Sequence, residues 1–164
     1  MREPLSRREA LAAGLAGAAV LALAPAAAAA GAASAEGDAL TALVQVEQDA
    51  VFVYRDAGLD VAATIARQDD EHAKALATHL EALGMPIPGP TRERDGLAPE
   101  ALAVLEAGAG AARRQAAMAY ERSLIAGCAQ RLAQLEDPNT VRTVATVMAG
   151  HAQHLVLHEL INRR

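Results

Sequence analysis

Aromatic residues are nearly absent from this 164-residue chain, which contains no tryptophan, one phenylalanine and two tyrosines. Proteins that bind single-stranded nucleic acid stack the bases on aromatic side chains, and binding to the phosphate backbone requires positive charge. The formal net charge of this chain is −5. Both features argue against a nucleic-acid partner. The single cysteine, Cys128, excludes an intrachain disulfide.

The motifs of several common enzyme classes are missing as well. No glycine-rich phosphate loop occurs. The three serines, Ser6, Ser34 and Ser123, lie outside any nucleophile-elbow pattern, so hydrolase chemistry of that kind has no support. What the chain does have is a 52% share of apolar residues, many of them alanine, which favours helix over strand. The length suits one domain.

Residues 1–35 have the organisation of an export signal. Arginines at positions 2, 7 and 8 precede an apolar run over residues 11–24, which Pro25 ends, and residues 33–35 form an A-x-A cleavage site. The run has 14 residues, which is short for a membrane span of ~20. The segment Ser6-Arg7-Arg8-Glu9-Ala10-Leu11 resembles a twin-arginine signal, although Ala10 stands where such signals often have phenylalanine.

We therefore expect export to the periplasm or another extracytoplasmic space by the twin-arginine route, with residues 36–164 as the mature domain. Cleavage would leave no integral membrane span; an uncleaved N-terminal anchor is the alternative. The mature chain would carry 12 basic and 18 acidic residues, a net charge of −6, and so has no electrostatic attraction to an anionic membrane. This acidic surface is compatible with a homodimer.

Four stretches of the mature chain have helical periodicity. They cover residues 38–57, 60–83 and 99–135, and a fourth stretch that begins at Asp137-Pro138. Asp38 and Asp137 are the expected caps, and Gly58 and Gly84 the expected stops. Gly108 and Gly110 are expected to bend or loosen the third stretch.

The connection over residues 84–98 has 15 residues and can reach ~50 Å, whereas the second helix would be ~36 Å long. The linker can therefore run the full length of the bundle. The sequence thus predicts an all-α four-helix bundle made of two antiparallel helical hairpins joined by one long crossover, the connectivity of ferritin-like folds.

Six polar residues interrupt the apolar stripes of these helices, at positions where burial is costly unless they are paired or bind a metal. They are Glu47, Asp69, His72, Glu121, His151 and His154.

Their spacing places them together. Glu47 and Asp69 lie equally far from the first hairpin tip at Gly58, and Glu121 is matched in the same way with His151 and His154 across the second tip. In each hairpin a glutamate therefore faces a pair of residues at positions i and i+3, which share one face of a helix. This pattern predicts a metal site in the core.

Three segments carry a family resemblance: Val46-Glu47-Gln48-Asp49-Ala50-Val51-Phe52-Val53-Tyr54, Asp69-Asp70-Glu71-His72-Ala73 and Ala149-Gly150-His151-Ala152-Gln153-His154. Over residues 38–162 the chain resembles the ferritin-like di-metal superfamily and is similar to small exported bacterial ferritin-like domain proteins. Their sites use one glutamate from each of two helices and Glu-x-x-His from each of the other two.

The resemblance implies that Glu47 and Glu121 are the single-glutamate ligands, and that Asp69, His72 and His154 are ligands of the x-x-His pairs. The chain departs from the pattern twice: Asp69 replaces a glutamate, and His151 replaces a bridging glutamate. The set is therefore rich in imidazole, which suits zinc, copper or iron. Iron is the metal we expect, bound as one or two ions, with zinc, copper and manganese as alternatives. If the site is redox-active, iron oxidation or the handling of peroxide or dioxygen would follow; metal binding for storage or buffering is the alternative.

A non-catalytic bundle with an eroded site is the alternative function. In that case the carboxylates would be solvated or paired with arginine, and no metal would bind. Among the remaining residues, His158 fits a charged position near a helix C-terminus, and His79 and Cys128 fit surface and core positions. Tyr54 and Tyr120 are read as core tyrosines, with electron transfer near a metal as the alternative.

Overall fold

Alanine-rich stretches bounded by glycine and proline produce a helical protein. A computed structural model describes residues 35–162 of the chain. Its helices cover residues 35–56 (called helix 35–56 below), Ala62–Ala82 (α2), Pro99–Glu106 (α3), Ala111–Leu132 (α4) and Pro138–Asn162 (α5). No strand occurs among the described residues. The prediction of an all-α helical bundle is confirmed; the predicted export signal lies outside the described residues apart from Ala35.

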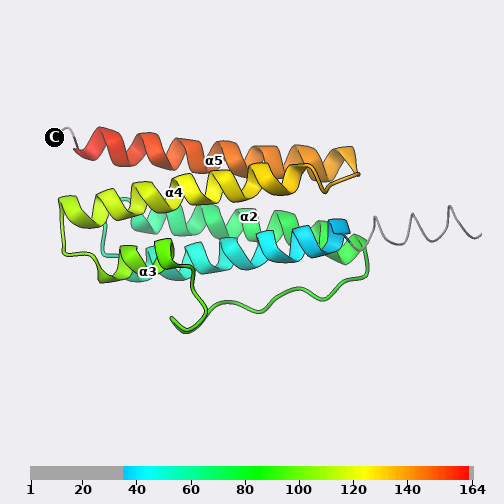
Figure 1. Cartoon of the computed structure of the whole chain (residues 1–164), viewed down its shortest axis with the longest axis horizontal. Coiled ribbons are helices and arrows are strands. Elements are labelled where there is room, and N and C mark those ends of the chain that lie inside the picture. The colour runs from blue at the N-terminus through cyan, green and yellow to red at the C-terminus, as the bar shows by residue number, and fades with distance from the viewer. Residues whose placement is uncertain (1–34, 163–164) are drawn as a thin grey trace, which may run out of the picture. The chain divides into compact units, whose positions relative to one another are not determined.

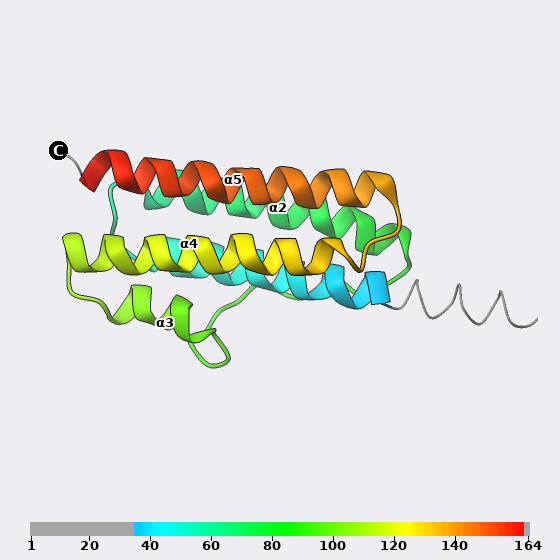
Figure 2. The ribbon, with the colours of Figure 1, turned by 45° about the horizontal axis from the view of Figure 1, so that its top comes forward.

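The four long helices lie side by side, and α3 packs on α4 (Figures 1 and 2). Helix 35–56 and α2 run in opposite directions, as do α4 and α5 (Figure 1). The segment between α2 and α3 returns along the length of the helices, so that α4 runs in the same direction as α2 (Figure 1). Within the described residues, no helix combines the length and the hydrophobicity needed to cross a membrane.

Helix ends follow the local sequence. Gly58 and Gly84 have positive φ angles of 61° and 68°, a conformation that ends a helix and that side chains with a Cβ avoid. At the start of α5, Asp137 accepts a hydrogen bond from the backbone N–H of Thr140 (2.8 Å), as a capping residue should. The expected cap at Asp38 is wrong, because residues 35–37 are already helical.

The third predicted helix is two helices, which corrects the expectation of one helix over residues 99–135. Ala107 is extended and Gly110 has a φ of 75°, so the helical path is broken between them. Arg113 bridges the break: its guanidinium donates to the carbonyl oxygen of Ala107 at 2.7 and 3.1 Å and to that of Ala57 at 2.8 Å. Arg113 is thus not a freely solvated charge, and it ties the break to the first hairpin tip.

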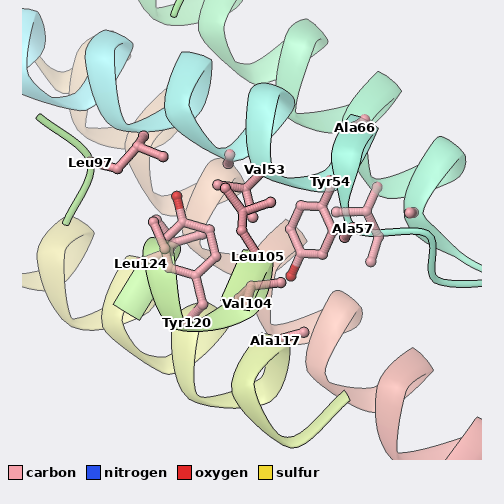
Figure 3. Close-up of a cluster of buried hydrophobic side chains, with 14 residues drawn as sticks. Val53, Tyr54, Ala57, Ala66, Leu97, Val104, Leu105, Ala117, Tyr120 and Leu124 are labelled. Carbon is pink, nitrogen blue, oxygen red and sulfur yellow. The ribbon is translucent and has the colours of Figure 1, made fainter. Parts of the chain in front are cut away.

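Two apolar clusters fill the core. One gathers around Tyr54 and Tyr120, where side chains of helix 35–56, α2, α3 and α4 meet (Figure 3). The other contains Leu40, Leu76 and Val144 and lies toward the opposite end of the helices. Along helix 35–56 and α2, the predicted polar residues stand between the members of the two clusters. Apolar packing therefore encloses them at mid-height.

Candidate metal centre

The structure brings all six predicted site residues together in the core. Their potential ligand atoms form two groups, within each of which these atoms lie within 4.8 Å of one another. One group is Glu47, Asp69, His72 and His151, and the other is Glu121, His151 and His154. Because His151 belongs to both, the two groups form one continuous cluster. Whether the six bind metal stays a prediction.

Each of the four long helices contributes to the cluster. Helix 35–56 supplies Glu47, α4 supplies Glu121, and α2 and α5 each supply two residues one turn apart. The three carboxylates and the α5 histidines are at most 1% exposed. The His72 side chain retains 17% exposure and is the cluster's one contact with solvent. Burying this many ionisable groups costs folding free energy unless the charges of the cluster are compensated.

His151 lies at the centre of the cluster between two carboxylates. Its Nε2 atom is 2.9 Å from Glu47 Oε1, and its Nδ1 atom is 2.9 Å from Glu121 Oε2. Burial alone would lower the pKa of His151, but hydrogen bonds from its ring to Glu121 and Glu47 raise it to about 11. Burial alone would raise the pKa values of Glu47 and Glu121. Their contacts with histidines outweigh this effect and lower both pKa values, that of Glu121 to about 2. An imidazolium between two carboxylates therefore satisfies this part of the cluster.

Asp69 is not satisfied in this way. Its side chain is fully buried, and neither carboxylate oxygen has a hydrogen-bond partner among the described residues. Its Oδ1 atom lies 3.8 Å from His72 Nδ1 and 3.7 Å from His154 Nδ1. Burial and the nearby charge of Glu47 raise the pKa of Asp69 well above its usual value. A buried carboxylate without donors is the kind of group that a cation stabilises.

His154 is held with one nitrogen facing the cluster. Its Nε2 atom lies 2.8 Å from Gln68 Oε1, and because an amide oxygen only accepts, Nε2 carries the proton. The Nδ1 atom faces Glu121 Oε1 at 3.4 Å and Asp69 Oδ1 at 3.7 Å, and it makes no hydrogen bond. An outer partner that fixes the histidine tautomer is typical of metal ligands. Gln68 directly precedes Asp69, but no feature of the residue pattern predicts its contact with His154.

Tyr54 extends the cluster toward the Tyr54–Tyr120 apolar region. Its hydroxyl donates to Glu121 Oε1 at 2.5 Å and lies 3.4 Å from His158 Nε2. Burial and the charge of Glu121 raise the pKa of Tyr54 well above its usual value. The tyrosine is therefore neutral and holds one oxygen of Glu121 in place. The Tyr120 ring lies 6.3 Å from that of Tyr54, centroid to centroid.

Three other residues considered from the sequence lie outside both groups. His158 is buried, and burial lowers its pKa, so the expected charged position near a helix C-terminus is wrong. His79 interacts with Thr140 and Thr143 on α5. Cys128 is a buried thiol in the apolar cluster of Leu40, Leu76 and Val144, and burial raises its pKa to about 12. The Cys128 thiol is therefore an unreactive part of the apolar core.

The donor set fits a transition-metal ion. The unpartnered Oδ1 of Asp69 lies 3.7 Å from the unpartnered Nδ1 of His154. Asp69 shares its group of neighbouring ligand atoms with Glu47, and His154 shares the other group with Glu121. Imidazole nitrogen combined with carboxylate oxygen suits zinc, iron, copper or nickel. Comparison with models of known protein families, with curated proteins and with solved structures found no match for this chain.

Proposed function

We propose that this chain is an exported ferritin-like metalloprotein, which binds one or two transition-metal ions between its four long helices. The directions of the helices support the ferritin-like arrangement, since two antiparallel hairpins are joined by a long connection and α2 and α4 run in parallel (Figure 1). The charge pattern of residues 1–35 supports export by the twin-arginine route.

Asp69 is the observation that carries the metal proposal. A fully buried carboxylate with two unpartnered oxygens is destabilising, and two histidine nitrogens stand within 3.8 Å of one of these oxygens. A divalent cation bound by the group that contains Glu47, Asp69 and His72 would compensate the buried charge. The free Nδ1 of His154 stands beside that group, 3.7 Å from Asp69 Oδ1. If position 69 only filled the core, leucine would be more stable there, because it has no polar group to bury.

The charge balance allows one ion or two. The three carboxylates carry three negative charges when ionised, and a protonated His151 reduces this to two, which one divalent ion neutralises. A second ion requires His151 to lose its proton and exchange a carboxylate contact for a metal bond. The group formed by Glu121, His151 and His154 would then hold that ion.

Iron is the metal that we propose, and when bound it supplies one-electron redox chemistry toward dioxygen or peroxide. The chain's own contribution is to hold the ligands from four helices, to keep water out through the two apolar clusters, and to orient Glu121 through the Tyr54 hydroxyl. The partly exposed edge of His72 is where a small molecule would reach the cluster.

The substitution Asp69→Asn tests the metal proposal. It keeps the shape of the side chain but removes its charge, so Fe(II) and Zn(II) affinity should fall by more than the roughly 10- to 100-fold that loss of an outer partner costs. The metal-free variant should melt several degrees higher than the metal-free parent. Because burial raises the pKa of Asp69, the folded parent pays a free-energy cost at neutral pH, either for a buried charge or for protonating the carboxyl group, and asparagine has neither cost. Calorimetric titration and thermal melts after chelation measure both effects.

His79→Asn is the matched control, because His79 is a histidine outside the cluster. Metal affinity in this control should equal that of the parent. If Asp69→Asn binds metal as tightly as the parent does, or if the parent purified after native export holds no metal, the proposal is wrong.

A metal-free structural bundle is the second candidate, and the position of His151 favours it. The Glu47–His151–Glu121 contacts already pair both glutamates without an ion. Elemental analysis after native export distinguishes the two candidates. Equal and negligible metal in the parent and in the double variant His151→Ala/His154→Ala would support the structural bundle.

A further inference from the structure

A glycine in the middle of α5 stands where a helix would normally exclude it. Gly150 directly precedes His151, far from both ends of Pro138–Asn162. Glycine in a helix interior is less favourable than alanine because the unfolded chain loses more conformational freedom. No turn or positive φ angle explains it, since Gly150 is not among the glycines with positive φ. Some contact should therefore require the missing side chain.

That contact is with His72 on α2. A Cβ atom at position 150 would lie 2.6 Å from His72 Cε1 and 2.8 Å from His72 Nε2, closer than carbon atoms approach without displacement. The imidazole of His72 thus occupies the space that an alanine methyl group would take. Among the helical glycines, Gly127 on α4 is different: a Cβ there would meet only Arg131 Nη1 at 3.4 Å, the mobile end of a long side chain.

His72 has no room to retreat inward. Its Nδ1 atom is 3.3 Å from Glu47 Oε2, its ring meets that of His151 edge to face at 5.5 Å, and it stacks on His154 at 6.2 Å between centroids. The remaining direction is toward solvent, where 17% of the side chain is already exposed. A methyl group on α5 would therefore push His72 outward, away from Glu47 and Asp69.

We propose that Gly150 is a positioning residue for the metal centre, which keeps open the slot through which His72 of α2 enters the cluster. This inference rests on the proposed function for its effect on metal, but the contact itself concerns the protein alone. The close approach of α2 and α5 at Gly150 then determines whether His72 can join Glu47, Asp69 and His151 in their group.

The test compares Gly150→Ala with Gly127→Ala, each made in the parent and in the His72→Ala background. Thermal midpoints are measured in chelator, Zn(II) affinity by calorimetry, and Co(II) coordination by its visible spectrum. Gly127→Ala should raise the midpoint by a few degrees in both backgrounds through helix propensity. Gly150→Ala should give this gain only when His72 is absent, and in the parent it should lower the midpoint.

In the parent background, Gly150→Ala should also weaken Zn(II) binding by about 10- to 100-fold and change the Co(II) spectrum, whereas Gly127→Ala should change neither. Equal stabilisation by Gly150→Ala in both backgrounds would overturn the inference. If the parent binds zinc, a Gly150→Ala variant with the same Zn(II) affinity as the parent would overturn it as well. If the parent binds no metal, the proposed function fails, and the midpoints in chelator still decide whether Gly150 positions His72.

Discussion

At the scale of single residues, the cluster combines one satisfied part and one unsatisfied part. His151 pairs with Glu47 and Glu121 at 2.9 Å on each side, whereas the two Asp69 oxygens have no donor among the described residues. This difference between His151 and Asp69 determines how the stability of the metal-free protein changes with pH. Ionic pairing makes its stability depend on pH, while the buried Asp69 carboxylate opposes folding when it is charged.

The metal-free protein should lose stability as the pH rises above 6.5. Folding raises the pKa of His151 from 6.5 to about 11, so its contribution is complete below 6.5 and disappears progressively as the pH rises through 11. Glu121 acts at the other end: its pKa falls from 4.5 to about 2, so its contribution exists above 4.5 and is lost as the pH falls through 2.

Thermal midpoints in chelator between pH 6 and 9 measure the alkaline effect. The variant His151→Gln, which cannot carry the charge, should show a shallower decline than the parent. A parent midpoint that stays level or rises over this range would contradict the assignment of a charged His151.

In the secondary-structure elements, the helix ends determine where the proposed ligands stand. The α5 histidines are at fixed distances from the cap at Asp137, and the α4 glutamate is at a fixed distance from the break that Arg113 bridges. A helix start displaced by one residue would rotate a ligand by about 100° around its helix axis. Capping therefore supports the site as well as the helix.

Replacement of Asp137 by alanine should lower the thermal midpoint by a few degrees. The change removes the acceptor for the Thr140 N–H and for the Thr140 hydroxyl. Asp137→Asn is the matched control, because asparagine keeps an oxygen that can accept the same backbone hydrogen bond, and its midpoint should stay near that of the parent. Circular dichroism melts measure both; an alanine variant as stable as the parent would show that the cap contributes nothing.

At the scale of the whole molecule, the proposed site joins all four long helices. The proposed ligands from helix 35–56, α2, α4 and α5 meet at mid-height, and an ion bound by the group that contains Glu47 and His151 would link both hairpins. An ion that binds only the folded state stabilises it by mass action, about 2.7 kcal/mol when its concentration is 100 times the dissociation constant. The stability of the bundle should therefore depend on metal.

Saturating Zn(II) or Fe(II), the latter without oxygen, should raise the thermal midpoint by roughly 10 °C. A chelator should reverse the rise, because the ion acts only while bound. Calorimetric scans at several metal concentrations measure the effect, and the Asp69→Asn variant should respond far less. A parent midpoint that is independent of metal would argue for the metal-free bundle.

The residue pattern was sufficient to predict helices and the composition of the cluster. Apolar periodicity marks the four long helices, and the distances of Glu47 and Asp69 from Gly58 place them at one level. These predictions succeed because helical spacing is a local property and an antiparallel hairpin converts equal spacing into proximity. The break in the third predicted helix was only half anticipated, since the bend signal at Gly108 and Gly110 does not reveal that Arg113 supports a complete interruption.

The helical class, the two hairpins and the six polar residues at one height can be predicted from the residue pattern alone, because each follows from periodicity and from glycine or proline at known positions. Which groups pair is visible only in the folded chain: His151 lies between two glutamates, Asp69 has no donor, Gln68 lies behind His154 and Gly150 lies against His72. These contacts join different helices. They depend on how the helices rotate and approach one another, which the packing of the entire core sets and which no local pattern encodes.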